Sequence, residues 1–410
     1  MAEHPSRVLV NCHLLDVNSA QVHPDQGIWV NDGRIQAVGS VDDVVAQARA
    51  IRAGIELTDL GGHYVLPGLM NLHVHLGLIH SSGTPDRTPA ARALRMASNA
   101  RHCLGAGVTT VRLVGENDGT DFALRDAIRA GRCLGPRILT AGQALCCTGG
   151  HGSGFDAIEL DGPSGFARGV RQQVSMGADL IKICISGGIG GVHERIRHSQ
   201  LTEEEIRAAV QVAHGWGRLV TAHAGPADAI SSAIDRGLDG VEHGYALDAA
   251  VVKKMVASRT WLVPTLCVTR CEAFYKRLGA PSHVLDKAVG AGEAHLAGIS
   301  LAIREGVRIA LGTDMLPFEE FDGTTATVRE LEFLVQAGLS PAAALRAATT
   351  EAACYLGLSG EVGDIVVGQE ADLIAVAANP LDDISRMRQL TFIMHAGRPA
   401  RPEPHGRRSA

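Results

Sequence analysis

The feature that most constrains the fold is a unit that recurs between residues 65 and 314. In each unit, a short run of apolar and β-branched residues, typical of a buried strand, precedes a segment with helical periodicity. The strand runs are 65–75, 107–115, 136–145, 178–188, 217–225, 239–247, 260–269 and 306–314. Eight consecutive strand–helix units predict an α/β protein with a (β/α)8 TIM barrel.

Signals at the helix ends agree with this prediction. In LTEEEIRAAVQVAHGWG, Thr202 can cap the helix and Glu205 occupies its third position. PADAISSAIDRG and EAHLAGISLAIREG each end on a glycine that can terminate a helix. A doubly wound open sheet is the alternative, but it would place a glycine-rich phosphate turn after its first strand. The glycine-rich stretches TGGHGSG and SGGIGG follow later strands, which disfavours a nucleotide-binding fold.

The two chain ends differ from the middle. Residues 7–60 and 362–398 alternate apolar and polar side chains, which is typical of strands with one buried face. Asp32-Gly33 favours a hairpin turn. We therefore expect one small β-sandwich built from residues 1–64 and 361–402, a barrel domain over 65–360, and a disordered tail at 403–410.

Composition excludes several classes of protein. With 46% apolar and 20% charged residues the chain can bury a large core, while its net charge of −6 and its lack of long basic runs disfavour nucleic acid as a partner. The nine cysteines include no CxxC pair and lie in apolar segments, for instance Cys103, Cys184 and Cys354, which predicts buried free thiols. No run approaches the roughly 20 apolar residues of a membrane span. We expect a cytoplasmic protein without a membrane partner.

Polar side chains interrupt or end five of the predicted strands. In LPGLMNLHVHLGL, His73 and His75 point to the same face because side chains alternate along a strand. The active site of a TIM barrel lies at the C-terminal ends of its strands. Each residue alone has an ordinary structural explanation, but six at one end of a barrel predict a site. The six are His73, His75, Lys182, His223, His243 and Asp314.

These six side chains predict a metal centre. Neutral imidazoles and carboxylates are usual ligands of zinc and similar divalent ions, and six groups exceed the needs of one tetrahedral ion. They suit two ions lying close together, most of all two Zn²⁺. The ammonium of Lys182 would be repelled by two cations. Reaction with carbon dioxide would turn it into a carbamate, an anionic ligand whose two oxygens can bridge the ions.

The set and its placement resemble the amidohydrolase superfamily, binuclear metal subtype, over essentially the whole chain. The resemblance implies that His73 and His75 bind one ion with Asp314. It implies that His223 and His243 bind the second ion, and that carboxylated Lys182 bridges the two. Two such ions can hold a bridging hydroxide that attacks an amide carbonyl. Asp314 is then expected to pass the proton to the leaving nitrogen, so Asp314 and Lys182 are the expected catalytic residues.

Further stretches resemble the imidazolonepropionase-like and prolidase-like group, which includes Xaa-Pro and Xaa-Arg/Lys dipeptidases and ochratoxinase-type amidases. They are TGGHGSG, IKICISGGIGG, EHGYALD and VPTL, after or on the third, fourth, sixth and seventh strands. The resemblance implies that His151 and Tyr245 contact the carbonyl or carboxylate region of the substrate. We expect hydrolysis of a small dipeptide or N-acyl amino acid, in a homo-oligomer.

Three alternatives remain. The same site could cleave a lactone, a carbamate or a phosphotriester, and Lys182 does not distinguish these. A mononuclear deaminase would usually lack that lysine and carry a glutamate where this chain has Pro226. A barrel that had lost its catalytic activity would lack some of the ligands, whereas none of the six is missing.

The acidic residues Glu319, Glu320 and Asp322 are consistent either with selection of a basic substrate or with a solvated face.

Overall fold

A computed structural model describes residues 6–52, 54–78, 86 and 88–400. Each of the eight predicted strand runs contains a strand of the barrel. These strands are β5 (Leu69–Val74), β6 (Val108–Leu113), β7 (Arg137–Thr140), β10 (Ile181–Cys184), β11 (Val220–Pro226), β12 (Gly240–Ala246), β13 (Trp261–Val263) and β14 (Arg308–Ile309). The predicted tail at 403–410 lies outside the described residues.

Parallel pairing joins the strands into a closed barrel. β5, β6 and β7 form one set of neighbours, and β10 to β14 form another with β8 (Ala144–Cys146) and β9 (Ala157–Glu159) at its edge. Leu72 N donates to Leu311 O (2.8 Å), and Asp179 N donates to Thr140 O (2.8 Å), which connects the two sets on both sides. The (β/α)8 prediction is therefore confirmed.

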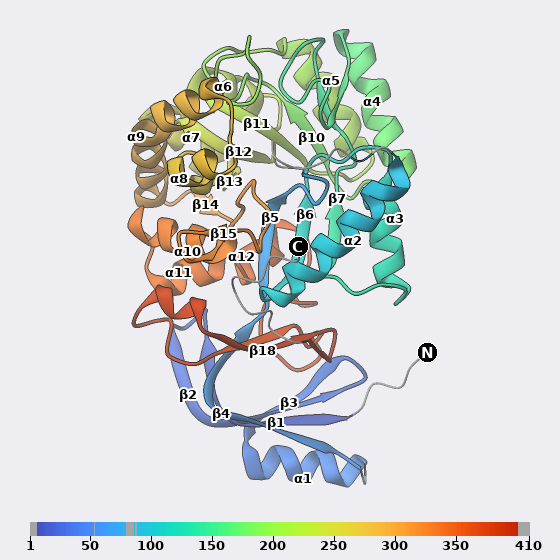
Figure 1. Cartoon of the computed structure of the whole chain (residues 1–410), viewed down its shortest axis with the longest axis vertical. Coiled ribbons are helices and arrows are strands. Elements are labelled where there is room, and N and C mark those ends of the chain that lie inside the picture. The colour runs from blue at the N-terminus through green and yellow to red at the C-terminus, as the bar shows by residue number, and fades with distance from the viewer. Residues whose placement is uncertain (1–5, 53, 79–85, 87, 401–410) are drawn as a thin grey trace.

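Helices surround the strands (Figure 1). Thr202 and Glu205 form the predicted capping box at the start of α5 (Glu203–Gly215), and Gly306 ends α9 (Ser282–Glu305) with φ = 85°. The helices that follow the barrel strands are α2 (Pro89–Gly105), α3 (Thr120–Arg129), α4 (Gly162–Met176), α5 (Glu203–Gly215), α6 (Ala227–Ile234), α7 (Ala249–Ser258), α8 (Glu272–Arg277), α9 (Ser282–Glu305), α10 (Ala326–Gln336), α11 (Pro341–Ala347) and α12 (Thr350–Tyr355). Short 3₁₀ turns occupy Leu266–Val268 and Ile384–Arg388, and a small hairpin pairs β15 (Glu320–Phe321) with β16 (Thr324–Thr325).

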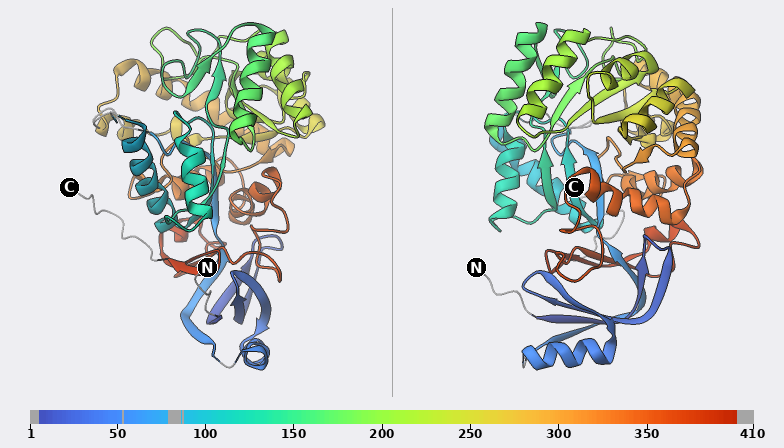
Figure 2. Two further views of the ribbon diagram at one scale, coloured as in Figure 1. Left: turned by 90° about the vertical axis from the view of Figure 1, so that its right-hand side faces the viewer. Right: turned by 180° about the vertical axis from the view of Figure 1, so that it is seen from behind.

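Both chain ends contribute strands to one seven-stranded mixed sheet, which is the part of the fold expected to be a small β-sandwich. Its order is β19-β18-β17-β4-β1-β2-β3. In Figures 1 and 2 this sheet lies at one end of the molecule and the barrel at the other. Its strands are β1 (Arg7–Asp16), β2 (Gln21–Asn31), β3 (Arg34–Ser40), β4 (Glu56–Pro67), β17 (Leu373–Val376), β18 (Leu390–His395) and β19 (Arg398–Ala400).

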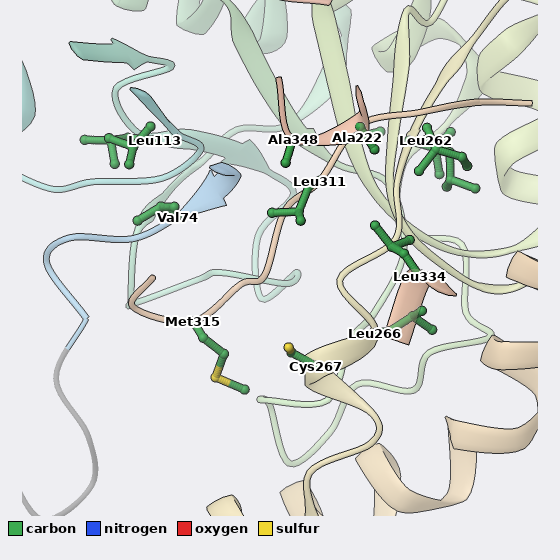
Figure 3. Packing of buried hydrophobic residues seen from close by; sticks show 14 of the residues in the cluster. Val74, Leu113, Ala222, Leu262, Leu266, Cys267, Leu311, Met315, Leu334 and Ala348 are labelled. Atoms are coloured by element: carbon green, nitrogen blue, oxygen red, sulfur yellow. The ribbon is translucent and has the colours of Figure 1, made fainter. Parts of the chain in front are cut away.

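Apolar packing forms one large core, which also includes Ile374 and Ile393 of the terminal sheet. Leu113, Leu262 and Leu311 belong to the large core of the barrel (Figure 3). Leu9 and Leu373 belong to a smaller core within the terminal sheet. No helix among the described residues is long and apolar enough to cross a membrane.

Three local predictions were wrong. Residues 41–51 form helix α1 (Val41–Ile51) rather than strand, because the hydroxyl of Ser40 accepts from Asp43 N and caps a helix that buries Val44. The third strand run breaks at Gly142, whose φ is 69°. Cys354 is exposed, although all nine thiols are free as expected.

Candidate metal centre

Two histidines and one aspartate converge at the C-terminal end of the barrel. His73 lies on β5, His75 follows that strand, and Asp314 follows β14. The Nε2 atoms of His73 and His75 lie 3.4 Å and 3.3 Å from the same Oδ1 atom of Asp314. One ligand atom from each of the three residues lies within 4.8 Å of the others. Two imidazole nitrogens and a carboxylate oxygen could therefore hold one divalent ion.

The outer nitrogens of these two histidines have their own partners. His73 Nδ1 donates to Glu242 Oε2 (2.7 Å), and His75 Nδ1 donates to Gly115 O (2.9 Å). Asp156 Oδ2 also lies 3.1 Å from His75 Nδ1. Hydrogen bonds of this kind fix the tautomer and the ring orientation of a ligating histidine. Both Nε2 atoms consequently face Asp314.

His223 and His243 differ in the ring nitrogen that is available to bind a metal ion. His223 on β11 donates from Nε2 to Gly187 O (3.2 Å), which leaves Nδ1 free to act as a ligand. His243 on β12 donates from Nδ1 to Thr265 Oγ1 (2.6 Å), which leaves Nε2. The two ring centroids are 4.6 Å apart, and those of His243 and His73 are 4.9 Å apart. Burial lowers the pKa of His223 and of His243 well below the ordinary value, so both rings are neutral, the form that binds metals.

Lys182 on β10 is buried beside these histidines. Only 4% of the residue is exposed, and its charge contributes to the low pKa values of His223 and His243. Within the described part of the chain, its ammonium has no hydrogen bond or ion pair. The six predicted residues therefore lie at one end of the barrel.

Asp314 remains ionised in this cluster. Burial raises the pKa of its carboxyl group, but the neighbouring His73 and His75 outweigh this effect and hold the pKa well below its usual range. The side chain is 28% exposed, so its carboxylate is accessible from outside. Asp314 and His243 adopt φ values of 55° and 70°, in the left-handed region. Strained backbone of this kind concentrates at functional sites.

The two residues expected to contact substrate lie against the histidine cluster. The ring of His151 stacks on that of His223, with centroids 3.7 Å apart, and its Nδ1 lies 3.0 Å from Glu194 Oε2. The ring of Tyr245 is parallel to that of His243, with centroids 4.9 Å apart. Contact of either residue with a substrate stays a prediction.

The sequence did not reveal a buried ion pair, Arg112 with Glu242, that contacts His73 of the candidate centre. Arg112 on β6 donates from Nη2 to Glu242 Oε1 (2.5 Å), and the hydroxyl of Thr221 donates to the same oxygen. Burial raises the pKa of Glu242, but the charge of Arg112 and the hydrogen bond from His73 lower it to about 2. Both charges interrupt apolar strands, the same signal that identified Lys182.

The acidic loop after β14 is partly paired with a cation. Arg277 Nη2 lies 3.9 Å from Glu319 Oε1 and donates to Glu320 O (2.6 Å). The side chains of Glu320 and Asp322 are exposed. The exposure of these two side chains fits a solvated face, which is one of the two explanations that the sequence allows.

A (β/α)8 barrel with this imidazole–carboxylate cluster at the C-terminal ends of its strands has the architecture of an enzyme with a candidate metal site. Residues 64–401 match the amidohydrolase family, and the chain belongs to that family. It is accordingly an enzyme that hydrolyses C–N bonds, and the predicted resemblance is confirmed.

Individual relatives cover between 81% and 97% of this chain. Ochratoxinase from Aspergillus niger is 30% identical over 363 residues, 81% of this chain and 74% of that protein. A structure of a Xaa-Pro dipeptidase with bound methionine is 31% identical, with a TM-score of 0.85 over 97% of this chain and 100% of the other. A prolidase complexed with N-methylphosphonate-L-proline is 28% identical, with a TM-score of 0.86 and the same coverage.

Proposed function

We propose that the chain is a binuclear metal-dependent amidohydrolase that cleaves the amide bond of a dipeptide or an N-acyl amino acid. The observation that carries this proposal is the convergence of four histidines, Asp314 and Lys182 at the end of the barrel. The similarity to an ochratoxinase, a Xaa-Pro dipeptidase and a prolidase supports an amide whose leaving group is an amino acid.

The donor set fits two divalent ions, most of all zinc. His73, His75 and Asp314 would hold one ion, and His223 and His243 would hold the other through nitrogens that make no other hydrogen bond in the described chain. A buried ammonium without an anionic partner is costly, which supports a carbamate on Lys182. As a carbamate, Lys182 would present two oxygens between the two sets of ligands.

The groups of the proposed centre have different roles in the reaction. Divalent ions bound here would polarise the amide carbonyl and lower the pKa of water towards about 7. The ionised carboxylate of Asp314 accepts the proton of the attacking water and passes it to the leaving nitrogen. Glu242 and Gly115 hold the rings of His73 and His75 in place through their Nδ1 protons.

His151 and Tyr245 are the candidates for binding the end of the substrate that carries the leaving amino acid. Each ring lies flat against a histidine of the candidate centre, which supports a role for both polar side chains in substrate binding. We assign them to the free α-carboxylate of the leaving amino acid. A site built for a carboxylate discriminates strongly against an analogue that lacks it, because its polar groups are then left unpaired.

The test is hydrolysis of a library of N-acyl amino acids and dipeptides, each with a free or an amidated C-terminus, followed by amine release. Free acids should be cleaved with kcat/KM higher by orders of magnitude. His151→Ala combined with Tyr245→Phe should abolish the discrimination, whereas Tyr64→Phe, at a tyrosine in the terminal sheet, should leave it intact. Equal rates for both forms would refute a peptidase and favour a lactone, a carbamate or another neutral substrate.

A further inference from the structure

The loop between β10 and α5 packs its backbone directly against the histidine cluster. A Cβ atom at Gly188 would lie 2.4 Å from Cε1 of His151 and 3.0 Å from Cε1 of His223. A Cβ atom at Gly187 would lie 2.5 Å from the carbonyl oxygen of Arg195. These distances are too short for a side chain, so the SGGIGG stretch allows the loop to form a wall of the site.

Glu194 joins this loop to His151. Its carboxylate accepts hydrogen bonds from Gly188 N (2.9 Å), Gly191 N (2.5 Å) and His151 Nδ1 (3.0 Å). The side chain is only 6% exposed. Burial raises the pKa of Glu194, but the proton and charge of His151 and the two backbone N–H groups lower it to about 2. Glu194 is therefore a buried carboxylate whose partners all belong to the wall or to His151.

Helix α9 holds the same loop from the outside. Lys287 Nζ donates to Gly191 O (2.5 Å) and to Glu194 O (2.7 Å), and His283 Nε2 donates to Gly190 O (3.0 Å). These contacts reach only the backbone of the loop. They therefore provide control variants that remove a contact of the loop backbone and keep both partners of the Glu194–His151 hydrogen bond.

We infer that Glu194 is a positioning residue, which holds His151 by its Nδ1 proton so that Nε2 faces the carboxylate of the substrate beside His223. The inference rests on the proposed function for the role of His151 and goes beyond it in assigning Glu194. A carboxylate on one ring nitrogen fixes the orientation of an imidazole, as it does in other sites where histidine must present the opposite nitrogen. Without Glu194, the His151 ring is free to rotate away from the substrate.

The first test needs no substrate. An imidazole N–H bound to a carboxylate gives a downfield proton resonance, which the variant His151→Ala assigns in the NMR spectrum of ¹⁵N-labelled protein. This resonance should disappear in Glu194→Ala, shift upfield in the isosteric Glu194→Gln and stay unchanged in Lys287→Met. If Glu194→Ala does not fold, Glu194→Gln decides. An unshifted resonance in Glu194→Gln would overturn the inference.

The second test is a double-mutant cycle with the free-acid substrate that the library shows to be cleaved fastest. Glu194→Gln should raise KM about tenfold or more with a smaller change in kcat, and should have no further effect when His151 is already alanine. Effects that multiply in the double variant would show that Glu194 does not act through His151. If no amide in the library is cleaved, the proposed function fails, and the NMR experiment alone decides the role of Glu194.

Discussion

Arg112 and Glu242 form an ion pair inside the barrel, with Nη2 of Arg112 2.5 Å from Oε1 of Glu242 and neither side chain more than 1% exposed. The second oxygen of Glu242 accepts the Nδ1 proton of His73. One ion pair thus supports both the barrel interior and the orientation of a metal-ligand candidate.

Replacement of Arg112 by methionine should destabilise the protein strongly. The substitution leaves the Glu242 carboxylate buried without its cation, which typically costs about 3–5 kcal/mol. Lys254→Met is the matched control, because its ammonium pairs with Asp235 at the surface, where an ion pair contributes about 0–1 kcal/mol. Urea unfolding of the metal-free proteins measures both. Equal losses in the two variants would contradict the importance of the buried pair.

The positions of Glu242 and His243 could not be predicted from the alternation of side chains along a strand. Alternation along a strand places neighbouring side chains on opposite faces. This rule correctly predicts that His73 and His75, two residues apart, point to the same face. Glu242 and His243 are neighbours, yet both contact His73. His243 has φ = 70°, which breaks the alternation. A backbone conformation of this kind is set by tertiary packing, so the sequence pattern could not reveal Glu242 as a partner of His73.

The barrel was predictable because eight apolar strand runs recur with helices between them, and long periodic patterns are the strongest signal in a sequence. Helix α1 was not predicted, because its sequence VDDVVAQARAI also has apolar residues spaced as in a strand. Its distinguishing signal is the cap at Ser40. Glu194 was not predictable either, since its partner His151 lies in a different loop, 43 residues earlier in the chain.

Lys182→Ala should lose most activity and at least one of the two bound ions. The variant removes the only side chain proposed to supply an anionic bridge between the two sets of ligands. Short carboxylic acids such as acetate or propionate should restore part of the activity by occupying the space of the side chain. Metal analysis and turnover, each measured with and without the acid, check this prediction. Wild-type activity and metal content in the variant would rule out a carbamate bridge.

Asp314→Asn should reduce turnover far more than substrate binding. The amide preserves the shape and one ligand oxygen, but it cannot accept a proton. Groups that act as general acids or bases contribute about 10²–10⁴-fold in rate, so a loss of kcat in that range is expected with little change in KM. Steady-state kinetics on metal-loaded protein measure the effect. An unchanged kcat would remove Asp314 from proton transfer.

Glu330 on α10 should make stability depend on pH. Its fully buried carboxyl group accepts from Leu266 N and Cys267 N (2.8 Å each), and burial raises its pKa from 4.5 to about 7. Between these two values the unfolded chain releases the proton while the folded chain retains it, so stability falls as pH rises. The fall amounts to about 3 kcal/mol at 1.36 kcal/mol per unit of pKa shift.

Glu330→Gln should abolish this part of the pH dependence. The amide does not ionise, so the difference in unfolding free energy between wild type and variant should move in favour of the variant as pH rises from 5 to 8. Glu204→Gln, at an exposed position of α5, is the matched control and should follow the wild-type profile. Parallel profiles for wild type and Glu330→Gln would contradict a neutral Glu330 in the folded protein.

The most direct measurement is a titration of metal-free protein with Zn²⁺, in which bound metal per chain and amine release from the best amide substrate are followed together. A binuclear centre predicts no activity before metal is added and a plateau of both quantities at two equivalents. A plateau of activity at one equivalent, or full activity in the presence of a strong chelator, would contradict a binuclear metal centre.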